Sequence, residues 1–140
     1  YHECESSMIA FIETGHSNVD LSTVKGEYGE YIEAYSKFLE KYVERVDMIR
    51  CFLRGSERTS FRQAWLDSIR RIFMELMEFS HVASIKERNY SSHFFAGGLQ
   101  ALLTTWIFDG CKEPTKVIAA IVARSLYQGL FSAGAPKKTR

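Results

Sequence analysis

The stretch HFFAGGLQALLTTWIFDGCKEP, residues 93–114, decides how the rest of the chain is interpreted. Across residues 89–111 the only charged residue is Asp109, and large apolar side chains cover more than one stripe of the expected helix. A helix that is apolar nearly all round is buried nearly all round. We therefore predict a helix over about residues 86–108 that is enclosed by protein on most sides.

A second charge-poor helix is expected to follow it. The first helix should stop at Asp109-Gly110, because glycine suits the left-handed position after a helix. Pro114 is expected in the first turn of the final helix, with Glu113 as its cap. Residues 117–123 of that helix carry no charge. Its apolar positions are Val117, Ile118, Ile121, Val122, Leu126 and Leu130.

Two adjacent helices of this kind indicate a second burial surface, most simply a symmetric dimer. The small residues Ala96, Gly97, Gly98 and Ala101 favour close approach of another helix. Glycine in a helix interior costs up to about 1 kcal/mol, so two in a row need a packing reason. The alternative interpretation is a central helix buried within a monomer.

Helical periodicity continues through the upstream half. Apolar residues over 32–53 follow one stripe of a 3.6-residue helix, kinked or broken once. Residues 60–63 fit a capping box that starts the next helix, whose apolar stripe runs over 61–77. Residues 8–12 are a weaker helical piece, and residues 18–29 are expected to form a loop.

No segment shows sustained strand alternation, so the predicted fold class is all-α. We expect an antiparallel helical bundle of about five to six helices. One domain should span residues 1–131, with residues 132–140 as a flexible basic tail. The chain begins with Tyr1, which indicates a fragment or a processed product.

The composition is that of one ordinary globular domain: 140 residues, 46% hydrophobic and 25% charged. The net charge of +1 argues against a dominant nucleic-acid or membrane surface. Three distant cysteines without a CxxC pair are typical of a reducing compartment. We expect a soluble cytoplasmic protein.

Residues that would carry catalysis or bind a metal do not cluster. The four histidines form no convincing helical-spacing pair with a His, Cys, Asp or Glu, and no nucleophile or phosphate-binding motif occurs. Cys51 lies near an apolar stripe and is expected to be buried and inert. We predict no enzyme activity, no cofactor and no metal site.

The C-terminal half resembles a known family. The aromatic-x-x-Gly-Gly-Leu pattern around Gly97-Gly98, followed by Trp106, a short turn and Pro114, resembles the penultimate helix and turn of TetR-family regulators. The resemblance covers about residues 28–130. It implies a homodimer in which the last two long helices pair with their mates, and a small-molecule effector of unknown identity. It also implies that DNA is bound through an N-terminal helix-turn-helix that this chain lacks.

The resemblance implies two sets of site residues. The expected dimer interface comprises Leu99, Leu102, Trp106, Val117, Ile118, Ile121, Val122 and Ser125. The expected ligand pocket comprises Phe38, Met48, Phe52, Trp65, Ile69, Phe73, His93 and Phe94.

For each aromatic residue in the pocket set, core packing is the alternative. His93 is expected to be either a hydrogen-bonded core histidine or a polar group inside the pocket. We interpret the whole chain as the ligand-binding and dimerisation domain of a bacterial regulator, and two alternatives stay open. One is a helical carrier or enzyme of small molecules or lipids, and the other is an interaction module without a pocket.

Overall fold

The computed structural model describes residues 6–12, 14, 28–55, 58–79 and 84–130, and their regular secondary structure is helical throughout. Residues 6–12 form a short helical segment. The helices that follow are α2 (Tyr28–Glu44), α3 (Val46–Arg54), α4 (Arg58–Phe79), α5 (Ile85–Phe108) and α6 (Thr115–Ser125), and α6 continues into a π-helical turn η1 (Leu126–Leu130). No strand occurs in this described part of the chain, and the all-α prediction is confirmed.

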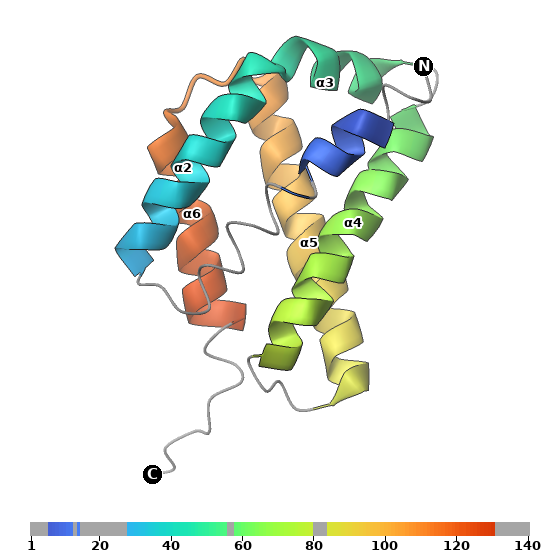
Figure 1. The fold of residues 1–140 in the computed structure, drawn as a ribbon, viewed down its shortest axis with the longest axis vertical. Coiled ribbons are helices and arrows are strands. Elements are labelled where there is room, and N and C mark those ends of the chain that lie inside the picture. The colour runs from blue at the N-terminus through green and yellow to red at the C-terminus, as the bar shows by residue number, and fades with distance from the viewer. Residues whose placement is uncertain (1–5, 13, 15–27, 56–57, 80–83, 131–140) are drawn as a thin grey trace.

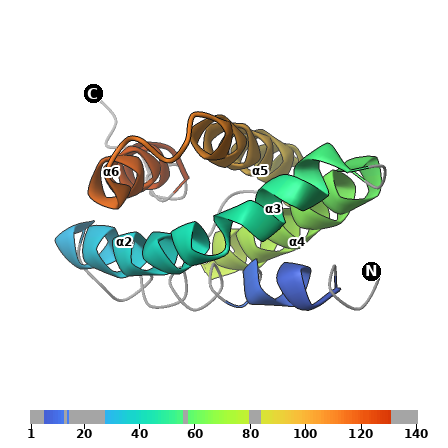
Figure 2. The ribbon, with the colours of Figure 1, turned by 90° about the horizontal axis from the view of Figure 1, so that it is seen from above.

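The helices form two layers, which Figure 2 shows from one end. Helix α6 packs on α2, and α5 packs on α4. Helix α3 connects α2 to α4 at one end of the molecule (Figures 1 and 2). Residues 6–12 lie on the side of this layer that faces away from α5 and α6. Helices α5 and α6 therefore make up one whole layer, with no further described helix covering them.

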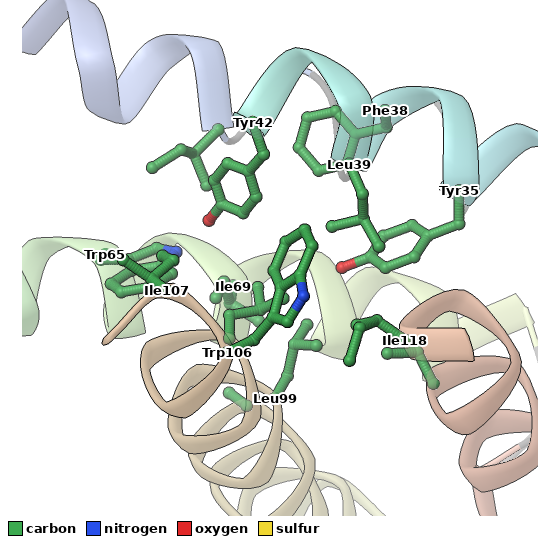
Figure 3. Close-up of a cluster of buried hydrophobic side chains, with 14 of the residues drawn as sticks. Tyr35, Phe38, Leu39, Tyr42, Trp65, Ile69, Leu99, Trp106, Ile107 and Ile118 are labelled. Atoms are coloured by element: carbon green, nitrogen blue, oxygen red, sulfur yellow. The ribbon is translucent and has the colours of Figure 1, made fainter. Parts of the chain in front are cut away.

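An aromatic core fills the space between the layers. Helix α2 contributes Tyr31, Tyr35, Phe38 and Tyr42, whose spacing of three or four residues puts them on one face. Trp65 of α4 is fully buried, and its ring lies edge-on to that of Tyr42 at a centroid distance of 6.5 Å. Figure 3 shows that side chains from α2, α4, α5 and α6 meet in this cluster.

Polar contacts link the layer of α5 and α6 to the layer of α2 and α4. The hydroxyls of Ser36 and Thr115 are hydrogen-bonded at 2.8 Å, and Lys116 pairs with Glu33 at 3.2 Å, so both contacts join α6 to α2. The Gln100 amide on α5 donates to the Arg62 carbonyl on α4 at 2.8 Å.

The break between α2 and α3 confirms the single interruption expected within residues 32–53. It falls at Arg45, and α3 then runs across the end of α5. There Arg50 donates to the Ile107 carbonyl at 3.0 Å, and the Arg54 guanidinium lies 4.9 Å from the centre of the Phe108 ring. A cation at these last carbonyls satisfies the open C-terminus of α5.

The turn after α5 confirms the role expected of glycine. Gly110 has φ +84°, and Cys111 also has a positive φ of 53°. The Cys111 amide donates back to the Trp106 carbonyl at 2.9 Å, which closes the helix end. The cap expected of Glu113 is wrong, because Pro114 is itself the residue before the first turn of α6, with extended backbone.

Other boundaries differ slightly. Helix α4 begins at Arg58, so residues 60–63 lie inside it and the capping box predicted there is wrong. The predicted loop over 18–29 lies mostly outside the described residues, and its last residue, Gly29, belongs to α2. The tail predicted at 132–140 also lies outside them.

Candidate functional site

An apolar groove between α5 and α6 is the candidate site. Helix α5 packs on α4, and helix α6 packs on α2. A cavity of about 550 Å³ lies between α5 and α6. Its lining comes from α5 and α6, with contributions from α4 and η1. The lining residues are Phe73, Phe94, Phe95, Gly97, Gly98, Leu99, Leu102, Ile121, Val122, Ser125 and Leu126.

The groove is chemically uniform. Among its described lining residues Ser125 has the only polar side chain, and none can ionise at neutral pH. An ionic ligand would find no partner on these walls, whereas an apolar side chain or molecule would exchange water for matching surface. The groove therefore suits an uncharged, apolar occupant.

The two glycines of the groove pack against none of the described residues of this chain. A methyl group built on Gly97 or on Gly98 would meet nothing within 4 Å. Both residues lie inside α5, where glycine is less favourable than alanine by up to about 1 kcal/mol. The space above them is open, so any packing reason for these glycines lies outside the described residues.

The groove continues into an exposed apolar face along α5. Tyr90 is 68% exposed and Phe94 is 76% exposed. Farther along the same face Ala101, Thr105 and Phe108 are exposed as well. This face carries no charged side chain between Tyr90 and Phe108, which is unusual for a helix surface that meets only water.

Five of the eight residues expected at the dimer interface line the groove. They are Leu99, Leu102, Ile121, Val122 and Ser125. Val117 lies on α6 and is 42% exposed. Trp106 and Ile118 are 4% and 3% exposed and belong to the core of this chain, as Figure 3 shows. The indole N–H of Trp106 donates to the Glu113 carbonyl at 3.0 Å, so the ring is held inward.

The residues expected to form the ligand pocket are dispersed. Phe73 and Phe94 line the groove. Phe38, Phe52, Trp65 and Ile69 are buried in the core. Met48 is 47% exposed on α3, and His93 is exposed on α5 instead of lying in the core. The helical stripe identified the buried aromatic residues, but it did not show that their neighbours would pack tightly around them.

The buried Tyr42–Trp65 pair is the polar feature of the core. Burial raises the pKa of the Tyr42 hydroxyl well above its ordinary value of 10.0, and a hydrogen bond with Trp65 partly opposes the shift. The hydroxyl therefore stays protonated at neutral pH, where its interaction with the indole stabilises the core without a buried charge.

Several groove residues were not assigned to a site from the sequence. Phe95 and Leu126 line it, and so do Gly97 and Gly98. The clustering of small residues around Gly97-Gly98 was the available signal: it favoured close approach of another helix, and in the described structure the space above the two glycines is open. Phe95 carried no separate signal, because apolar residues surround it on all sides of α5.

The two cysteines that the structure describes, Cys51 and Cys111, belong to no cluster of metal-binding residues, and Cys4 lies outside the described part. Cys51 is exposed, so its predicted burial is wrong: Ile49, Phe52 and Leu53 take the inner face of α3 and leave Cys51 outside. Burial raises the pKa of the Cys111 thiol, and the nearby positive charge of Arg50 opposes this. Within the described residues no group of three or more His, Cys, Asp or Glu could hold a metal ion. Among the described helices, none has the length and hydropathy needed to cross a membrane.

Comparison with known proteins adds one match. Residues 29–128, from the start of α2 into η1, match a TetR-type family model described as "Transcriptional regulator C-terminal region". The comparisons with curated proteins and with solved structures found no match. The matched segment includes both helices of the groove.

Proposed function

Since the chain belongs to the TetR-type family of transcriptional regulator C-terminal regions, we propose that it joins two copies of its regulator through the α5–α6 face. Operator DNA is then the partner of another domain of the regulator, as the resemblance implies. A regulator of this kind would act at the chromosome, and we propose the cytoplasm as its location on that ground.

The observation that most strongly supports this dimer is the open, uncharged groove at Gly97 and Gly98. Glycines that meet no described residue of their own chain are explained if a second helix approaches them closely. A symmetric interface brings the same surface together twice, so a charge near its centre meets a like charge. The absence of charge along the described α5 face is what a self-complementary surface needs.

The size of the face is also sufficient. Helix α5 has 24 residues and is therefore about 36 Å long. Helix α6 has 11 residues and η1 has 5, so together they are about 24 Å long. With each helix about 10 Å wide, the face offers about 600 Å². Stable interfaces bury from about 600 Å² on each partner upward, so the face reaches the lower end of that range.

The test is the mass of the chain in solution. Sedimentation equilibrium at tens of micromolar should give a dimer. Ala101→Arg should give a monomer with an unchanged helical circular dichroism spectrum, because it places two like charges across the two-fold axis. Gln63→Arg adds the same charge at an exposed position of α4, away from the face, and should leave the dimer intact. A monomeric wild-type chain, or a dimeric Ala101→Arg variant, would contradict the proposal.

Effector binding is a second candidate function, favoured by the cavity. Its volume of about 550 Å³ lies within the range of roughly 300–1,000 Å³ typical of small-molecule pockets. In the monomeric Ala101→Arg background, where no second copy fills the groove, an uncharged fluorescent probe such as N-phenyl-1-naphthylamine should bind. Gly98→Leu fills the groove and should abolish binding, whereas Gln63→Leu adds an equal side chain elsewhere and should not. Equal binding to both variants would exclude the groove as the effector site.

A further inference from the structure

We infer that Phe94 of each copy packs into the α5–α6 groove of the second copy, and that the two α5 helices cross antiparallel at Gly97-Gly98. This inference rests on the proposed dimer and specifies its geometry. Phe94 is the most exposed large apolar side chain in the described part of the molecule, at 76%. An aromatic ring so exposed is a typical anchor for an interface.

The chain itself holds the Phe94 ring outward. Phe94 and Phe95 lie edge to face, with ring centroids 5.5 Å apart and an interplanar angle of 88°. The Phe95 ring in turn contacts the buried Phe73 at 6.1 Å. Phe94 is therefore supported at the rim of the groove and does not fold into it.

The small residues of α5 determine where a second helix can come close. If the two-fold axis passes beside Gly97-Gly98 and reverses the helix direction, Phe94 of one copy lies opposite Ala101 and Leu102 of the other. Ala101 leaves room for the ring, and Leu102 and Ile121 line the groove that receives it. A large residue then meets a small one, as close packing requires.

A parallel arrangement would pair residues of equal size instead. Phe94 would lie against Phe94 of the second copy, and the two rings would hold the helices apart and leave a gap between the facing glycines. Such a gap loses contact energy on both sides. Size complementarity along the face therefore favours the antiparallel crossing.

Dimer affinity measured by sedimentation tests the role of Phe94. Phe94→Ala should weaken the dimer by about 30-fold or more, the range of an interface hot spot. Tyr90→Ala is the matched control, since Tyr90 is almost as exposed and lies one turn away, but does not line the groove. It should weaken the dimer less than about fivefold. Equal effects of the two variants would overturn the inference while leaving the dimer itself established.

Disulfide crosslinking tests the geometry directly, in a chain whose Cys4, Cys51 and Cys111 are changed to serine. A mixture of Phe94→Cys and Ala101→Cys chains should form a mixed disulfide, because the two Cα atoms must approach within about 7 Å. Phe94→Cys alone should crosslink poorly. Efficient crosslinking of Phe94→Cys to itself would overturn the antiparallel crossing. A monomeric wild-type chain would instead refute the proposed function, so the two failures are distinguishable.

Discussion

The two sides of α5 have similar chemistry and different surroundings. The inner side, with Leu103, Trp106 and Ile107, is closed by helices of its own chain. The outer side, with Phe94 and the two glycines, is open. Both sides are apolar, so hydrophobicity alone does not distinguish the surface that folds the chain from the surface that remains available to a partner.

Side-chain size distinguishes the two sides better. The inner side carries large residues that interlock with aromatic rings of α2 and α4. The outer side alternates small residues with projecting rings, a pattern that leaves space for another helix. This comparison predicts that mutations on the inner side change the stability of one chain, whereas mutations on the outer side change association.

The largest effect is expected in the core that the inner side of α5 faces, at Trp65 of α4. Trp65→Ala removes a fully buried indole and should lower the free energy of unfolding by about 3–5 kcal/mol. Phe94→Ala is the outer-side counterpart and should change it by less than about 0.5 kcal/mol. Urea unfolding in the monomeric Ala101→Arg background measures both. Similar losses for the two variants would remove the distinction between the sides.

An effect of opposite sign is expected from the glycines. The double variant Gly97→Ala/Gly98→Ala should raise the free energy of unfolding of the monomer by about 1–2 kcal/mol, because alanine favours the helix and meets no neighbour. The same variant should weaken the dimer, since the added methyl groups separate the helices. Thermal melts of the monomer and sedimentation of the dimer give the two values. A less stable monomer would show that the glycines serve this chain's own fold.

The smallest effect concerns the polar pair of the core and depends on pH. Tyr42→Phe should lower the free energy of unfolding by about 1 kcal/mol at pH 7, because the buried hydroxyl and its contact with the Trp65 indole are lost.

The pKa of Tyr42 is raised in the folded chain, so the unfolded tyrosine ionises first. The stability associated with this group is fully present below pH 10 and decreases as the pH rises through the folded-state pKa. Urea unfolding between pH 8 and pH 11 should show a smaller decrease for Tyr42→Phe than for the wild type. Equal decreases would indicate that other groups cause the alkaline loss.

The sequence predicted the elements of the fold well and the site only in part. Charge-free residues 89–108 indicated a long enclosed helix, and its limits were correct to one residue at each end. Trp106 and Ile118 were expected at the interface, but their side chains complete the inner core. Periodicity shows which residues share the apolar face of a helix, but it does not show which other helix will pack against that face.

His93 and Cys51 illustrate the same limit. Both lie next to strongly apolar residues in the sequence, and both are exposed in the structure. A helix turns about 100° per residue, so an immediate neighbour of a buried residue often points outward. Assigning such residues needs the direction of the core, which depends on contacts between distant segments.

The sequence by itself determined that this chain is helical, that its last two helices carry excess apolar surface, and that Gly110 ends α5 in a left-handed turn. These are local properties, set by periodicity, charge and backbone freedom. The tertiary structure alone decided which half of that apolar surface is closed and which is open. Closure depends on α4 packing along one side of α5 and on α3, which lies farther back in the sequence, crossing its C-terminal end, and helical periodicity specifies neither contact.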